Sequence, residues 1–242
     1  MSVVFALLII ALASLAVFLF FGIRLALKVR TLRRAMDPSN PDPVAREKVF
    51  RDVAKRAGER VPNEIHLEPA TMILWKDEDK WRQAYNALEN HGFRHAGNYR
   101  VLEIGVDVQF LVNDRECLLA CIYNHPVVGV FMDVVTRYQD GSCVTFANRE
   151  ASGLDQHPCL QNRFLGSVSP AELIDRALAE RPQQPMREIH DQDLAPDFCR
   201  VWKEYKQWRN KRGTSAEEVE RIYARLHDAQ QQKAKETSAG SN

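Results

Sequence analysis

A carboxylate and a guanidinium group lie on the same face of one predicted strand, where they could bind a ligand together. Asp133 and Arg137 are four residues apart, so both side chains leave the same face of an extended strand. On a concave face they would bind a polar small molecule, with Asp107 or Gln109 completing the pocket. The alternative is a solvated sheet face whose charges form cross-strand pairs. We favour the solvated face, although the apolar Phe131 shares this alternation.

Cys121 and His125 have the residue types of a thiol nucleophile and its base. A thiolate needs an imidazole within hydrogen-bonding reach to lower its pKa. Four residues along one strand keep the two groups apart unless a turn at 124–126 folds the imidazole back. Cys121 also alternates with Leu119 and Tyr123, as a small core residue does. We therefore interpret Cys121 as a buried structural cysteine.

A second thiol and imidazole lie close together in His157-Pro158-Cys159, within a region that lacks periodicity. Loops often carry functional residues, so we take His157 as a candidate binding residue. A metal ion would need further ligands from elsewhere, and neither Cys-x-x-Cys nor His-Glu-x-x-His spacing occurs. We also find no glycine-rich phosphate loop and no nucleophile elbow. We therefore predict no metal, no cofactor and no catalytic residue.

Aromatic side chains and cations share a predicted helix at 196–212. Its apolar stripe consists of Phe198, Val201, Trp202, Tyr205 and Trp208. Such a helix can contact a membrane surface or nucleic acid, and Trp202 and Trp208 are its candidate binding residues. Because the cations lie mostly off the stripe, docking on its own domain or on the next helix explains the pattern more simply.

Alternating hydrophobic residues predict the sheet that must position these groups. The alternation runs over about 99–147 and is broken by turns at 113–114, 124–126 and 139–142. Connections this short require antiparallel neighbours, because a parallel crossover needs about a dozen residues or more. The sequence therefore predicts an antiparallel meander, followed by a loop at 148–168.

Helical patterns precede and follow the sheet. Residues 77–91 begin with three acids, which suit a helix N-terminus, and end at Gly92. The apolar stripe that should cover the sheet consists of Trp81, Ala84, Tyr85 and Leu88. Residues 169–172, Ser-Pro-Ala-Glu, are typical of a helix start. We therefore expect an α+β domain at 44–182.

A basic helical hairpin is expected after this domain, at 183–232. Its first helix should end at Gly213, and the capping box at 215–218 should open the second. Six cations accompany one acid between residues 198 and 212. The polar residues 233–242 predict a disordered tail.

The N-terminal segment predicts a transmembrane anchor at 1–30. Residues 3–23 carry no charge, and about 20 apolar residues span a bilayer. A cleaved signal peptide would need a basic start and a shorter apolar core. Because five cations follow at 24–34 and favour the cytoplasmic side, we expect the N-terminus outside. A basic, proline-rich linker at 31–43 would then lead to a cytoplasmic domain, in a bacterial inner membrane.

Charge and cysteine content narrow the class of protein. The net charge is +1 although two segments are strongly basic, so the rest of the chain is acidic overall. A bulk nucleic-acid binder is usually basic throughout, so we do not expect nucleic acid as a partner. Five cysteines without regular spacing do not predict a disulfide framework, which suits a reducing compartment.

These patterns favour a membrane-tethered interaction or scaffold module without catalytic activity. It would bind the lipid bilayer through residues 3–23 and a protein partner through its sheet or C-terminal helices. One alternative is a membrane-anchored, hydrolase-like enzyme with a pocket near Asp133, Arg137 and the 157–159 loop. The other is membrane-surface or nucleic-acid contact through the basic helix 196–212. A concave polar cavity on the sheet would favour the enzyme.

Overall fold

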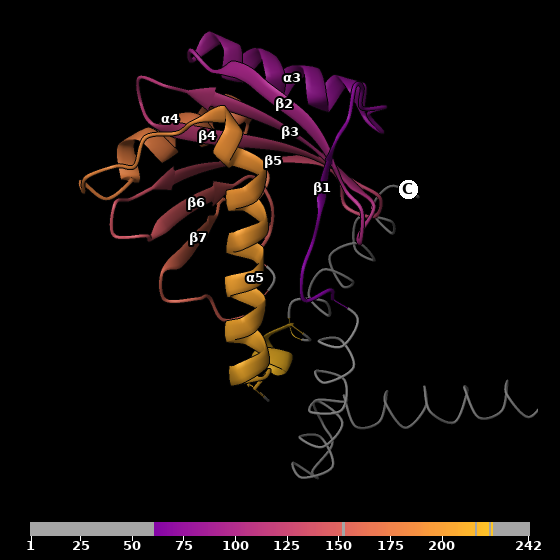
Figure 1. Cartoon of the computed structure of the whole chain (residues 1–242), viewed down its shortest axis with the longest axis vertical. Coiled ribbons are helices and arrows are strands. Elements are labelled where there is room, and N and C mark those ends of the chain that lie inside the picture. Colours follow the sequence, from indigo (N-terminus) through magenta and orange to yellow (C-terminus); the bar gives the residue numbers. More distant parts are fainter. Residues whose placement is uncertain (1–60, 152, 216, 223, 225–242) are drawn as a thin grey trace, which may run out of the picture. The chain divides into compact units, whose positions relative to one another are not determined.

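The computed structural model describes residues 61–151, 153–215, 217–222 and 224. The predicted anchor and linker and the predicted tail at 233–242 lie outside these residues. Within the described part, no helix is long and apolar enough to cross a bilayer. A seven-stranded sheet with helices on both faces makes the fold α+β, as the sequence predicts (Figure 1).

The strands follow one another across the sheet in chain order. They are β1 (Leu67–Pro69), β2 (Arg94–Val101), β3 (Val106–Asn113), β4 (Leu118–His125), β5 (Gly129–Arg137), β6 (Cys143–Ala147) and β7 (Leu160–Phe164). The helices are α3 (Glu78–Asn90), α4 (Pro170–Glu180) and α5 (Leu194–Arg212), with a short 3-10 helix, η1 (Asp191–Asp193), before α5. All strand pairs are antiparallel except β6 with β7.

Local capping explains where α3 and α4 begin. The side chain of Asp77 accepts a hydrogen bond from the backbone N–H of Lys80 at 3.0 Å. Ser169 accepts one from Glu172 N–H at 3.2 Å, and Pro170 occupies the first turn. Both predicted helix starts are therefore confirmed.

The alternation along the strands gives the sheet two buried faces. On the face covered by α3 and α4, the fully buried side chains include Leu88, Leu111, Ile122, Met132 and Phe146. We call this the α3 face. On the opposite face, the core around α5 includes Val108, Phe110, Leu119, Cys121 and Leu194. We call this the α5 face. Because both faces are covered, β3 is buried along its whole length.

The sheet extends beyond the predicted strands at both ends. β2 begins at Arg94 rather than near residue 99, and a bulge interrupts its pairing between His95 and Gly97. Its residues are mostly polar and half-buried, so the strand lacks an apolar alternation. At Gly97 the φ of 152° suits glycine, and a Cβ atom would lie 2.7 Å from the Tyr99 ring.

The prediction of a loop at 148–168 is wrong because this segment contains β7. This strand pairs in parallel with β6 after a connection that spans 148–159. Five residues with one fully buried side chain carry too little periodicity to predict a strand. The β3–β4 turn is also longer than the predicted turn at 113–114, since it extends to Cys117, which has a φ of 50°.

Neither edge of the sheet offers a long free template for a further strand. The side chain of Gln156 bonds the N–H and the C=O of Asn162 in β7, at 2.5 and 2.8 Å. It thereby occupies the groups with which an added strand would pair. At the other edge, β1 has only three residues and ends in Pro69.

The C-terminal helix α5 packs on the sheet, which is the simpler of the two interpretations of its apolar stripe. Its Leu194 is fully buried, and Phe198 lies against Phe110 with ring centroids 5.7 Å apart. Gly213 ends the helix with a φ of 75°. The capping box also forms, since Glu218 N–H donates to Ser215 Oγ at 3.2 Å and residues 217–222 are helical.

Candidate binding groove

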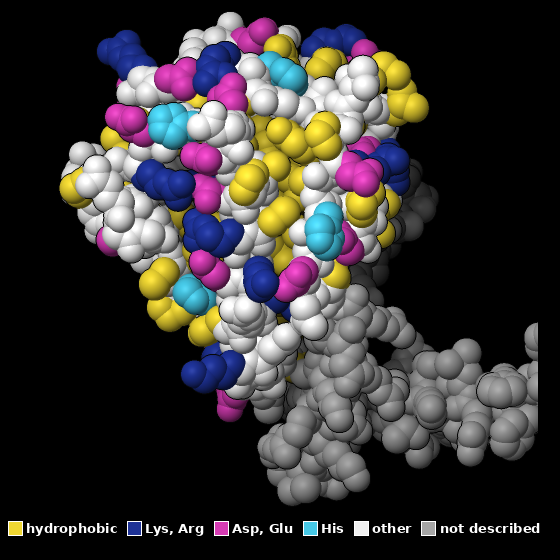
Figure 2. Space-filling view, in the orientation of Figure 1, with side chains coloured by type: hydrophobic (Ala, Val, Ile, Leu, Met, Phe, Trp, Pro, Cys, Tyr) yellow, Lys and Arg dark blue, Asp and Glu magenta, His cyan; other side chains and the backbone are white. Residues whose placement is uncertain are grey.

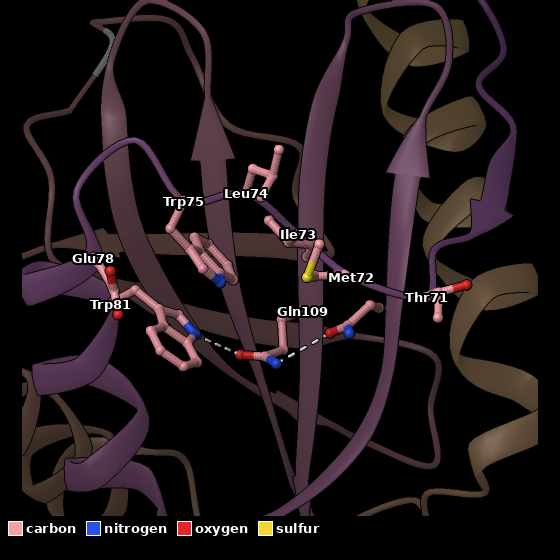
Figure 3. Close-up of a pocket in the computed structure, with 9 residues that line it drawn as sticks. Thr71, Met72, Ile73, Leu74, Trp75, Glu78, Trp81 and Gln109 are labelled. Carbon is pink, nitrogen blue, oxygen red and sulfur yellow. Dashed lines mark hydrogen bonds between the residues drawn. The ribbon is translucent and has the colours of Figure 1, made fainter.

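A groove of about 420 Å³ opens on the α3 face, where residues 71–75 cross the sheet toward α3 (Figure 3). Its volume is in the range of small-ligand sites. The lining residues come from the crossing segment, α3, β2 and β3: Thr71, Met72, Ile73, Leu74, Trp75, Glu78, Trp81, Asn98 and Gln109. The groove thus combines an apolar wall with a small polar floor.

Hydrogen bonds between three elements fix the polar floor. Trp81 Nε1 of α3 donates to Gln109 Oε1 of β3 at 2.9 Å, and Gln109 Nε2 donates to Asn98 Oδ1 of β2 at 3.0 Å (Figure 3). Gln109 is only 6% exposed, so an unpaired amide there would be costly. The polar floor therefore accounts for Gln109, one of three buried polar residues in β3.

The apolar wall alternates between side chains that face the core and side chains that face solvent. Ile73 is buried, whereas Met72 and Leu74 are 71% and 78% exposed. Trp75 stacks on Trp81 with ring centroids 5.6 Å apart and an interplanar angle of 14°. Large apolar side chains are thus offered to solvent beside a rigid aromatic pair.

The crossing segment is held in place at both ends. Ala70 N–H donates to Asn98 C=O at 2.8 Å. Further along, the buried Asn124 of β4 donates from Nδ2 to Leu74 C=O at 2.9 Å and accepts from Lys76 N–H at 3.2 Å. Because these bonds fix the backbone around residues 71–75, the groove is preformed.

The predicted pocket around Asp133 does not form as proposed. Asp133 and Arg137 share the α5 face, but Asp107 and Gln109 lie on the opposite α3 face. Their strand partners show this, since Gln109 pairs with Ile122 whereas Asp133 pairs with the neighbouring Cys121. The solvated-face interpretation is also wrong, because α5 covers this face. Arg137 instead donates to Asp197 of α5 at 2.5 Å.

Asp133 nevertheless has an unusual environment under α5. Its Oδ1 atom is buried and has no hydrogen-bond partner among the described residues. Burial raises the pKa of its carboxyl group to about 6, although a hydrogen bond from Tyr123 and the charge of Arg149 act in the opposite direction. Burial likewise raises the pKa of the Cys121 thiol. A raised thiol pKa disfavours the thiolate, as expected for a structural cysteine.

The other predicted site residues lie along α5. His157 contacts Trp208 edge-on with ring centroids 5.3 Å apart, and its Nδ1 accepts from Cys159 N–H at 3.1 Å. Trp202 donates from Nε1 to Pro62 C=O at 3.1 Å. In the described part of the chain, no hydrogen bond or ion pair joins Asp133 to His157 or Cys159. The groups of the hydrolase-like alternative therefore do not form one constellation.

Acidic residues pair with most cations of α5. Arg200 bonds Glu204 at 2.8 Å, and Lys203 bonds Glu64 at 2.7 Å. Arg209, which is 9% exposed, bonds the buried Glu218. Figure 2 shows cationic and acidic side chains interspersed over this face, with hydrophobic side chains gathered between α5 and β1. This pairing weakens the attraction of the basic helix for phosphate groups.

Sequence reasoning missed the groove although it named two of its residues. Trp81 was assigned to an apolar stripe and Gln109 to a different pocket, and their contact depends on how α3 docks on the sheet. Among the described residues, no three potential metal ligands converge. No family model, curated protein or solved structure matches the chain.

Proposed function

We propose that the protein is a membrane-tethered interaction module, without catalytic activity, that binds a partner protein in the groove beside α3. The observation that carries the proposal is a preformed groove with a stacked Trp75–Trp81 pair and two largely exposed apolar side chains, Met72 and Leu74. Tryptophan is enriched among the residues that dominate binding energy at interfaces, and methionine adapts its shape to different ligands.

The short or partly occupied edges of the sheet support the choice of the groove. Strand addition needs free backbone N–H and C=O groups at an edge, and Gln156 occupies those of Asn162 in β7. β1 is too short to serve as a template. A partner is therefore best accommodated by side-chain contacts, with an apolar side chain seated on the Trp75–Trp81 pair.

The tether would act by concentrating the module at a membrane. We propose that residues 3–23 span the bilayer, with the N-terminus outside and the domain on the cytoplasmic side, because of the cations at 24–34. Confinement next to a membrane partner raises the effective concentration. A groove of modest intrinsic affinity would then suffice.

Affinity purification of the full chain from detergent-solubilised membranes tests this function. The groove variant is Met72→Asp with Leu74→Asp, which places two carboxylates on the apolar wall. The control is Leu102→Asp, in the β2–β3 turn, where the side chain is 46% exposed. We expect one partner to be retained by the wild type and by the control, and reduced at least about tenfold in the groove variant. Equal retention by all three proteins would exclude the groove as the binding site.

A further inference from the structure

The turn between β4 and β5 displays two adjacent hydrophobic side chains. Val127 is 88% exposed and Val128 is 60% exposed. Isolated exposed hydrophobic residues are common, but two consecutive ones on an exposed turn form a small apolar patch. We call residues 126–128 the β4–β5 tip. It is a single exposed turn, whereas the groove is lined by several elements.

His125 holds this tip in one conformation. Its Nδ1 accepts hydrogen bonds from the backbone N–H groups of Val127 and Val128, both at 3.1 Å. Burial and the nearby charges of Arg149 and Lys76 lower the pKa of this imidazole, which favours the neutral form that can accept these bonds. Because the turn is already ordered, binding through the two valines would cost little further conformational entropy.

Two cations, Lys76 and Arg149, flank the tip. Lys76 donates to Pro126 C=O, and Arg149 lies over the rings of Phe131 and Phe164 at 5.3 and 5.1 Å. Neither forms an ion pair with an acid among the described residues. Most other arginines of this part of the chain do form one, including Arg94, Arg100 and Arg137. Lys76 and Arg149 thus remain available to an external anion.

We propose that the β4–β5 tip, together with Lys76 and Arg149, contacts an anionic lipid surface. Apolar side chains on a projection insert at the boundary between headgroups and acyl chains, while flanking cations attract anionic headgroups. Two highly exposed valines beside two cations match the chemistry of an anionic lipid surface, which offers acyl chains below charged headgroups. The contact lies beyond the proposed function and does not require the groove, but it rests on the predicted anchor. The anchor makes a weak contact effective because it confines the domain near the membrane.

Photo-crosslinking of the full chain in nanodiscs tests this contact. One variant is Val127→p-benzoylphenylalanine, and the control is Asp140→p-benzoylphenylalanine, in the turn at the other end of β5. The nanodiscs contain phosphatidylcholine either alone or with phosphatidylglycerol. We expect lipid adducts at position 127, at least about fivefold more abundant than at position 140 and increased by phosphatidylglycerol.

A charge variant separates electrostatic attraction from proximity alone. Lys76→Gln with Arg149→Gln should reduce the lipid adducts at position 127 at least about threefold in phosphatidylglycerol nanodiscs. Equal adducts at positions 127 and 140, or adducts at position 127 that respond neither to phosphatidylglycerol nor to the charge variant, would overturn the proposal. In native membranes, an adduct at position 127 to a protein instead of lipid would also overturn it.

Discussion

At the scale of single residues, the clearest consequence of the fold is the cost of ionising Asp133. The sequence places this carboxylate on one face of a strand, but only the docking of α5 shows that the face is covered and its β5 side chains are half-buried. Its pKa rises from an ordinary value of 3.8 to about 6, chiefly through burial. Between these two pH values the folded protein retains a proton that the unfolded chain has lost. The contribution of Asp133 to stability is therefore fully present below pH 3.8 and is lost as the pH rises through 6.

Asp133→Asn should remove this loss because the amide cannot ionise. We expect the variant to be more stable than the wild type at pH 8, by up to roughly 3 kcal/mol, and to lose this advantage at pH 4. The measurement is thermal unfolding of the full chain in detergent at several pH values. Asp79→Asn, at an exposed position of α3, is the control and should change little. A variant that is less stable than the wild type at pH 8 would contradict the argument.

The sequence named single residues of the candidate site but did not predict that they meet. The types of Trp81 and Gln109 were informative, but they are 28 positions apart and meet through a contact between α3 and β3. The exposure of Met72 and Leu74 depends in turn on the two hydrogen bonds that Asn124 makes to the crossing segment. Such long-range contacts leave no periodic pattern in the sequence.

At the scale of elements, the sequence predicted the helix starts and the strand order that depend on capping residues and short turns. Asp77 and Ser169 begin helices because their side chains satisfy free N–H groups, and short turns force β3 to β6 into a meander. β7 was missed because it pairs with β6 across a connection at 148–159 and buries little apolar surface. Strands that depend on non-local pairing were therefore the ones that the sequence did not predict.

The packing of α3 gives a matched pair of substitutions. Leu88 is fully buried against the sheet, whereas Leu74 is 78% exposed at the groove. Leu88→Ala should lower the free energy of unfolding by about 2–5 kcal/mol, since it removes buried methyl groups and leaves a cavity. Leu74→Ala should change it by less than about 0.5 kcal/mol. Chemical denaturation of both variants checks this, and similar losses would show that α3 is not docked as described.

At the scale of the whole molecule, acidic residues of the domain pair with most cations of the basic segment at 198–212. The sequence predicted a basic surface on α5, but acidic residues from other segments pair with its cations, including Glu64 and Glu218. Lys76 and Arg149, which form no ion pair within the described part of the chain, lie instead beside the β4–β5 tip. Because Asn124 bonds both Leu74 and Lys76, the groove and the tip are adjacent. A domain that rests on its tip would hold the groove close to the membrane, where a membrane-bound partner is reached most easily.

The most direct test of the central claim is photo-crosslinking from the groove of the full chain in its own membrane. With Leu74→p-benzoylphenylalanine, we predict one discrete protein adduct, and the same label at Asp140 should not give it. Trp75→Ala removes half of the stacked pair and should reduce the adduct at position 74 at least about fivefold. An absent adduct, identical adducts at positions 74 and 140, or an adduct that is indifferent to Trp75→Ala would contradict the assignment of the groove as the binding site.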